Sequence, residues 1–275
     1  MKSIIYIKEL KVLNIKIGGS MKPILEIGNV SYSYHTLQGE TTALNDINLS
    51  VMPGQFISIV GPSGCGKSTL LSLISGLIKP DSGSITINEK KIEDSNTNIG
   101  YMLQKDNLFE WRTVYSNVLL GLEIQNKITK STTKTIDDML KAYGLESFKN
   151  ARPSQLSGGM RQRVALIRTL ALEPDILLLD EPFSALDYQT RLEVCDDIGA
   201  ILRREGKTAI LVTHDLSEAI SLGDIVVVLS KRPGKIRTIV PIDMEIENRT
   251  PLTSRSSPKF KDYFNLIWKE LTDHV

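Results

Sequence analysis

Short apolar runs alternate with helical patterns along most of the chain. The candidate strands are residues 24–30, 55–61, 82–88, 98–103, 175–180, 208–213 and 225–230. The last three are near-continuous Leu, Ile and Val, which is typical of parallel strands buried on both faces. The earlier runs alternate more and adjoin tight turns such as KPDSG at 79–83, which favours antiparallel pairing. The pattern predicts an α/β fold with a mainly parallel sheet and an antiparallel β subdomain.

A more polar, helical pattern interrupts this alternation between about residues 108 and 150. The stretch EIQNKITKSTTKTIDDMLKAYG has amphipathic spacing and predicts helix. We expect an inserted α-helical subdomain at about 105–165 within a main domain at 21–245. The segment KFKDYFNLIWKELTDHV then predicts a C-terminal helical extension at 246–275.

Residues 1–20 form a separate N-terminal extension in this interpretation. Lys and Glu residues break each apolar run there, so the segment does not match a secretory signal. Gly18 and Gly19 can be encoded by a GGAGG sequence, which would place a ribosome-binding site just before the codon of Met21. Translation from Met21 and a genuine extension starting at Met1 both remain open, and the intact mass of the natively expressed protein distinguishes them.

Composition narrows the class of protein. The chain has 275 residues, 41% apolar and 24% charged, which suits one large α/β core or two unequal lobes. No apolar run approaches the roughly 20 residues that a membrane-spanning helix needs. A net charge of +1 gives no basic field for nucleic acid. The two cysteines, Cys65 and Cys195, are expected to be free thiols in the reducing cytosol.

The stretch GPSGCGKST matches the phosphate-binding loop G-x-x-x-x-G-K-[ST], between the apolar run FISIV and the helical pattern TLLSLISGL. Its backbone N–H groups and the following helix N-terminus suit phosphate oxygens, which predicts ATP binding. Lys67 would reach the β- and γ-phosphates as a catalytic cation, and Ser68 would bind Mg²⁺. Cys65 is interpreted as a small filler residue rather than a catalytic thiol. The predicted loop residues are Gly61, Pro62, Ser63, Gly64, Cys65, Gly66, Lys67, Ser68 and Thr69.

A second motif, ILLLDEP at 176–182, delivers two acidic residues to the carboxyl end of a strand, where α/β proteins place their active sites. Asp180 suits Mg²⁺, bound through water. Glu181 suits a general base that activates the attacking water. An acidic strand end before a turn at Pro182 is the ordinary structural alternative, and the phosphate loop upstream argues against it.

The stretch LSGGMRQR at 156–163 resembles the signature sequence of the ATP-binding cassette (ABC) ATPases, and the resemblance extends from about residue 24. It implies that Ser157, Gly158 and Gly159 bind ATP held by the phosphate loop of a second copy. A helix starting at these residues would present its free N–H groups and positive dipole to a γ-phosphate. An ordinary Ser-capped helix start is the alternative.

Other positions match the family in the expected order. The resemblance implies that Gln104 ligates Mg²⁺ and senses the γ-phosphate, and that Asp187 of the SALD sequence couples the two nucleotide sites. It also implies that His214 is a catalytic switch residue holding the γ-phosphate. Tyr34 fits the aromatic side chain that stacks on adenine, with Tyr32 on the same strand face as the alternative.

The resemblance implies an ATP-hydrolysing subunit of a bacterial ABC importer, working at the cytoplasmic face of the membrane. Its partners would be a second copy, separate membrane permease subunits and, indirectly, an extracytoplasmic solute-binding protein. The segments FEWRTVYSNV and SKRPGKI are similar to the branch for nitrate, sulfonate, taurine and related solutes, although Glu110 replaces a frequent proline. Leu108, Phe109 and Trp111 are expected to be exposed in a groove for a coupling helix, or else to be subdomain core.

Two other classes compete with this interpretation. Soluble cassette ATPases that act on ribosomes or nucleic acid typically carry tandem cassettes or long coiled coils. This chain has one set of motifs, with only about ninety residues between phosphate loop and signature and no sustained heptads. A small-molecule P-loop kinase would explain Lys67 and Ser68 but would leave LSGGMRQR and SALD without a role.

Overall fold

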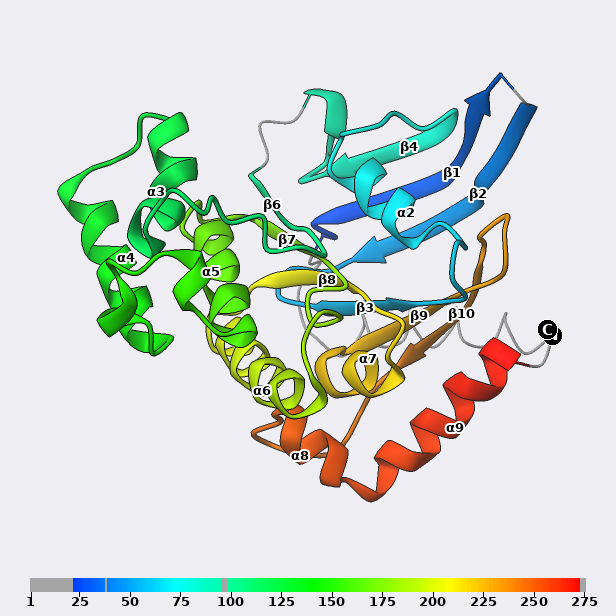
Figure 1. The fold of residues 1–275 in the computed structure, drawn as a ribbon. Helices are drawn as coiled ribbons and strands as arrows, with labels where there is room; N and C mark the ends of the chain where they lie inside the picture. Colours follow the sequence, from blue (N-terminus) through cyan, green and yellow to red (C-terminus); the bar gives the residue numbers. More distant parts are fainter. Residues whose placement is uncertain (1–21, 38, 95–97, 273–275) are drawn as a thin grey trace.

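The computed structural model describes residues 22–37, 39–94 and 98–272, which form two sheets and their covering helices (Figure 1). The predicted extension at 1–20 and the choice between Met1 and Met21 lie outside these residues. The smaller sheet is antiparallel, with strand order β2-β1-β4-β5. Its strands are β1 (Leu25–Thr36), β2 (Gly39–Val51), β4 (Ser82–Ile87) and β5 (Lys90–Lys91).

The larger sheet has strand order β10-β9-β3-β8-β7-β6. All neighbouring pairs in it are parallel except β9 and β10, so the mainly parallel core is confirmed. Its strands are β3 (Phe56–Val60), β6 (Ile99–Met102), β7 (Ile176–Asp180), β8 (Thr208–Val212), β9 (Ile225–Leu229) and β10 (Ile236–Pro241). Antiparallel pairing of the earlier runs is confirmed for β1 and β4 and wrong for β3 and β6. Strand direction depends on the crossovers that join strands, which local alternation does not encode.

Helices cover both faces of the larger sheet because successive strand residues point to opposite sides. Leu177 and Leu179 pack with α5 (Gly158–Leu170) and α6 (Tyr188–Arg204) on one face. Ile176 and Leu178 pack with α2 (Lys67–Ile74) on the other face, beneath the antiparallel sheet. Figure 1 shows α2 between the two sheets and α5 and α6 on the opposite side. The helices are α2 (Lys67–Ile74), α3 (Val114–Ile124), α4 (Lys130–Ala142), α5 (Gly158–Leu170), α6 (Tyr188–Arg204), α7 (Leu216–Leu222), α8 (Pro251–Ser256) and α9 (Pro258–Thr272).

Polar side chains fix where several of these helices begin. Thr113, Thr129, Ser157, Asp187 and Asp215 each accept a hydrogen bond from a backbone N–H in the first turn of the following helix. Such a cap stabilises a helix by about 1 kcal/mol. Helices α3 and α4 occupy the region where the sequence predicts helix, at the left of Figure 1. The domain boundaries themselves stay a prediction.

The C-terminal part of the described chain packs on the edge of the larger sheet. Ile267 of α9 is fully buried in a cluster with Val226 and Val228 of β9. On the same helix Phe264 and Trp268 stack, with ring centroids 6.3 Å apart. Within the residues that the structure describes, no helix has both the length and the apolar character to cross a membrane.

Candidate nucleotide-binding site

The phosphate loop connects β3 to α2, as the motif predicts. The ammonium group of Lys67 is buried and donates to the carbonyl oxygens of Gly61 at 2.9 Å and Pro62 at 3.1 Å. Cys65 is also buried, and burial raises the pKa of its thiol. A thiol held neutral in this way is a poor nucleophile, which supports its interpretation as a filler residue. Ser63, Gly64 and Ser68 face solvent on the other side of the loop.

Gly66 precedes α2 with a φ of +106°, a conformation that residues with a Cβ rarely adopt. A Cβ atom at this position would lie 2.7 Å from Cδ2 of Leu44 and 3.0 Å from the carbonyl oxygen of Ala43. Residues of strand β2 therefore pack so closely against the loop that position 66 has no room for a Cβ atom. Only glycine can make the turn into α2 there. The loop is held in its curved shape before any nucleotide binds.

Ser68 and Asp180 meet at the carboxyl end of the parallel strands. The Ser68 hydroxyl donates to Oδ1 of Asp180 at 3.1 Å. Burial raises the pKa of Asp180, with the neighbouring Glu181 carboxylate adding to the effect. Tyr101 of β6 also hydrogen-bonds Asp180, and burial together with that carboxylate raises the pKa of the phenol to about 12. A carboxylate destabilised in this way gains from a nearby cation.

Glu181 is the centre of a second polar cluster. Its Oε2 lies 3.2 Å from Nδ1 of His214 and accepts from Nε2 of Gln104 at 3.4 Å. The same Gln104 nitrogen donates to the Ser184 hydroxyl at 3.3 Å, and that hydroxyl donates to the Glu181 carbonyl oxygen at 2.9 Å. Glu181 has a φ of +45°, and a strained backbone at a non-glycine residue is typical of functional sites. The sharp bend separates its side chain from that of Asp180.

The signature residues lie at the exposed N-terminus of α5. The Ser157 hydroxyl accepts from the backbone N–H of Met160 at 3.3 Å, and Ser157 and Gly158 face solvent. Gly159 is buried against α6, and a Cβ there would lie 2.8 Å from Cγ2 of Thr190. Because α5 and α2 pack on opposite faces of the sheet, the signature and the phosphate loop do not meet in one chain (Figure 1).

The remaining predicted residues flank these two groups. Oδ1 of Asp187 accepts from the backbone N–H of Thr190 at 3.1 Å, and hydrogen bonding from Thr190 lowers the pKa of Asp187. The Tyr34 hydroxyl lies 3.0 Å from Oγ1 of Thr69, so this ring stands beside the phosphate loop with 43% of its surface exposed. Tyr32 packs partly into the core and meets the Tyr34 ring edge-on at 5.0 Å. Tyr34 is the better placed of the two for a ligand.

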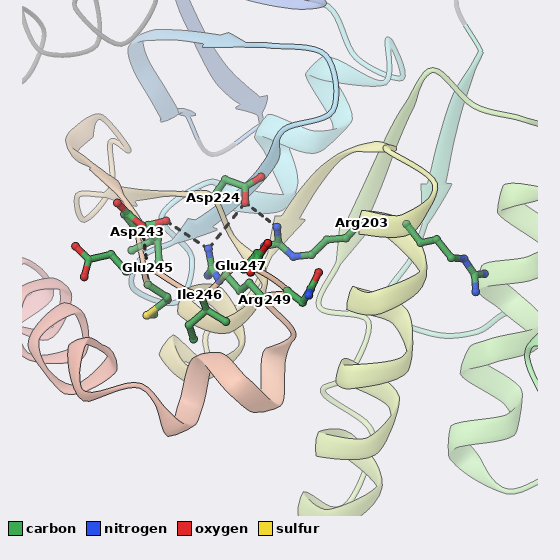
Figure 2. Close-up of a pocket in the computed structure, with 11 residues that line it drawn as sticks. Arg203, Asp224, Asp243, Glu245, Ile246, Glu247 and Arg249 are labelled. Atoms are coloured by element: carbon green, nitrogen blue, oxygen red, sulfur yellow. Dashed lines mark hydrogen bonds and ion pairs between the residues drawn. The ribbon is translucent and has the colours of Figure 1, made fainter. Parts of the chain in front are cut away.

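A cavity of about 440 Å³ lies elsewhere, where the segment after β10 passes the C-terminus of α6 (Figure 2). Two of its arginines, Arg203 and Arg249, are paired within the chain. Arg203 pairs with Asp224 at 3.0 Å, and Arg249 donates to the carbonyl oxygens of Ile220 at 2.6 Å and Gly223 at 2.9 Å. Burial lowers the pKa of Arg249 to about 10. The cavity marks the anchoring of residues 242–249 and contains none of the predicted site residues.

Comparison with known proteins agrees with this geometry. The sequence model of the ABC transporter family matches residues 44–184, from β2 to the SALD turn. The chain belongs to the ABC transporter family. It is 45% identical over 247 residues to the ABC transporter ATP-binding protein YtlC of Bacillus subtilis, covering 90% of this chain and 95% of the relative. It is 42% identical over 209 residues to the taurine import ATP-binding protein TauB of Pelagibacter ubique, covering 76% and 79%.

Among solved structures, the chain is similar to the ATP-binding cassette MJ0796, in a dimeric post-hydrolysis state bound to ADP and Pi. The TM-score is 0.69 at 33% identity, covering 80% of this chain and 99% of the other. The P-loop ATPase fold predicted from the sequence is therefore confirmed, and the chain is an ATP-binding, ATP-hydrolysing cassette protein. Solved cassettes of this kind are dimers.

Proposed function

We propose that two copies of this chain sandwich two ATP molecules. Each site would combine Lys67, Ser68 and Glu181 of one copy with the helix tip at Ser157 of the other. The observation that carries the proposal is the placement of phosphate loop and signature helix on opposite faces of one sheet. An exposed helix N-terminus attracts an anion, and the γ-phosphate held by a second copy supplies one.

In this proposal Glu181 is the general base for the attacking water. Its Oε2 is already paired with His214, which would hold the γ-phosphate, and Gln104 orients the carboxylate from the other side. Lys67 would leave the carbonyl groups that it contacts and bind the β- and γ-phosphates. Asp187 would face the second site from the start of α6, and Tyr34 would stack on adenine beside Thr69.

Mg²⁺ fits the adjacent oxygens of Ser68 and Asp180, and Gln104 would supply a third ligand. Mg²⁺ prefers hard oxygen ligands and usually takes only one or two from the protein, because phosphates and water supply the rest. The part-buried Asp180 carboxylate, whose pKa is raised, would be stabilised by the cation. Bound there, Mg²⁺ would neutralise charge on the phosphates of ATP.

Glu181→Gln tests the sandwich and the base together. We expect the variant to bind ATP, to lose about 10²–10⁴-fold in turnover, and to persist as a dimer in light scattering with ATP. Glu193→Gln, an exposed position on α6, is the matched control and should turn over ATP normally. Rapid hydrolysis by Glu181→Gln would exclude Glu181 as the base. ATP-loaded variant that stayed monomeric at high concentration would refute the sandwich.

We further propose that the pair powers a bacterial importer for a small solute such as taurine or another sulfonate. Support comes from the taurine import relative and from the segments FEWRTVYSNV and SKRPGKI. The partners would be membrane permease subunits at the cytoplasmic face and, through them, an extracytoplasmic solute-binding protein. Deleting the gene should abolish uptake of one labelled solute among taurine, alkanesulfonates and nitrate. Unchanged uptake of all three would refute this solute class.

The surface next to Gln104 is the proposed docking groove for the permease. A cavity of about 340 Å³ there is lined by residues 104–108, Arg161, Gln162 and Ala185. Trp111 is 70% exposed and packs on Phe109, with ring centroids 4.7 Å apart. The prediction that Leu108 is exposed is wrong: its side chain is buried in the core of α3–α5, and its backbone N–H is held by Asp106.

Trp111→Ala tests this docking surface. We expect the variant to keep wild-type ATP affinity and dimerisation while losing copurification with the permease and solute uptake, because the ring is exposed and Trp111 is not among the proposed nucleotide-binding residues. Ile124→Ala is a control at an equally exposed apolar position on α3. Normal uptake in a Trp111→Ala strain would move the docking surface elsewhere.

A further inference from the structure

A part-buried guanidinium and a buried carboxylate face each other across α6 and α7 without a hydrogen bond between them. Nε of Arg191 lies 4.0 Å from Oε1 of Glu218. This nitrogen is buried and has no hydrogen-bond partner among the residues that the structure describes. Glu218 is only 4% exposed. Nε atoms of Arg163, Arg203 and Arg255 are also buried and unpaired within the described part of the chain. Nε of Arg191 differs because it is itself the nearest atom to a carboxylate oxygen, which a small movement would bring within hydrogen-bonding distance.

Arg191 and Glu218 each hydrogen-bond to a different turn of the nucleotide site. Nη2 of Arg191 donates to the carbonyl oxygen of Leu186 at 3.0 Å, inside the SALD turn. Oε2 of Glu218 accepts from the hydroxyl of Thr213 at 2.5 Å, and Thr213 directly precedes His214. The pair therefore lies between the turn that would face a second copy and the turn that carries the switch histidine.

Asp215 fixes the second turn in the same way. Its Oδ1 accepts from the backbone N–H groups of Ser217 and Glu218 at the start of α7, and its own N–H donates to Thr213. Its Oδ2 lies 3.6 Å from Nη1 of Arg191. Arg191 is thus held by a hydrogen bond to Leu186 and a longer ion pair with Asp215, and its Nε lies 4.0 Å from Glu218.

We propose that Arg191 and Glu218 are positioning residues that link the SALD turn to the His214 turn. When ATP draws a second copy against the SALD turn, Nε of Arg191 moves about 1 Å to hydrogen-bonding distance of Oε1 of Glu218. The closed pair fixes Thr213 and so orients His214 toward Glu181 and the γ-phosphate. The inference rests on the ATP sandwich proposed above. It adds a connection, within each copy, between the SALD turn and the turn that carries His214.

Closure has an electrostatic consequence that can be measured. Burial raises the pKa of Glu218 to about 7, which brings the titration of this carboxyl into the neutral range. The charged or titratable groups around it are Arg191 and Cys195 of α6 and Asp215 and His214 of the turn. An approaching guanidinium favours the ionised carboxylate, so closure lowers the pKa of Glu218.

The experiment follows the Glu218 carboxyl by ¹³C NMR in Glu181→Gln protein, labelled at glutamate and titrated with and without ATP. Glu218→Gln identifies the signal. We expect a midpoint near pH 7 without nucleotide and a fall of at least about one pH unit with ATP, a tenfold change in proton affinity. Arg191→Gln should abolish the fall, and Arg191→Lys, which keeps the charge without Nε, should reduce it. Arg203→Gln, on the same helix but paired with Asp224, should leave it unchanged.

Light scattering on the same samples separates the outcomes. A dimer whose Glu218 midpoint does not move overturns the link and leaves the sandwich intact. A fall that survives in Arg191→Gln assigns it to another group and also overturns the link. If no dimer forms with ATP, both proposals fail.

Kinetics gives an independent readout. We expect Arg191→Gln and Glu218→Gln each to lower kcat about tenfold with little change in KM, and the double variant to be no slower than the slower single variant. Additive losses would show that the two residues act separately and would overturn the link. Arg203→Gln should hydrolyse ATP at the wild-type rate.

Discussion

Replacing Glu218 by Gln should stabilise the protein above neutral pH. The ordinary pKa of 4.5 for a glutamate is raised to about 7 here, chiefly by burial. The native state therefore binds a proton more tightly than the unfolded state, and the free energy of unfolding falls as pH rises from about 4.5 to about 7. Each pKa unit corresponds to about 1.4 kcal/mol, so the charged carboxyl costs about 3 kcal/mol above pH 7. Gln keeps the acceptor for Thr213 and cannot ionise.

Urea unfolding at pH 5 and pH 8 measures this effect. The stability difference between Glu218→Gln and wild type should shift by about 2.5 kcal/mol in favour of the variant between the two pH values, with the m-value unchanged. Glu193→Gln, an exposed glutamate on α6, should follow wild type at both pH values. Parallel pH dependence of wild type and Glu218→Gln would refute the reasoning. Together with the expected tenfold loss of kcat, a stabilised variant would show stability given up for function.

Three further substitutions test other parts of the structure. Gly66→Ala should weaken ATP binding at least tenfold in a fluorescent nucleotide titration, because its Cβ meets Leu44 and its φ is unfavourable. Arg161→Gln should lower the free energy of unfolding in urea by about 1–3 kcal/mol, since it leaves the part-buried Asp106 without its two-point partner, now at 2.8 and 3.1 Å. Phe183→Ala removes a fully buried ring after the catalytic strand and should cost about 3–5 kcal/mol by the same assay. Wild-type behaviour of any variant would contradict the contact concerned.

Local sequence predicts the interior strands and the edge strand β6, but not the edge strands β2, β5 and β10. The runs at β3, β7, β8 and β9 are nearly all apolar because both faces of those strands are covered. Strands β2 and β10 lie at the edges of their sheets and mix polar with apolar residues, so no predicted strand corresponds to them. Such an edge strand forms by pairing with a single neighbouring strand, and that neighbour can lie anywhere in the sequence.

Some residues of the candidate site could likewise be predicted from local sequence, and others could not. Residues within a contiguous motif, such as Lys67, Asp180 and Glu181, can be predicted because their chemistry follows from short spacing. Tyr101 could not, because its contact with Asp180 depends on the register between β6 and β7. Arg191 and Glu218 lie 27 residues apart, and only the packing of α6 and α7 brings them together. Side chains that support a motif therefore become visible only with the tertiary structure.

The placement of the signature helix and the phosphate loop on opposite faces of the sheet has a genetic consequence. A copy disabled at Lys67 still carries a sound helix tip, and a copy disabled at Ser157 still carries a sound loop. A mixed pair of the two would contain one wholly intact composite site and one doubly damaged site. Two alleles, each inactive alone, should thus restore partial activity when expressed together, whereas two alleles damaged in the same element should not.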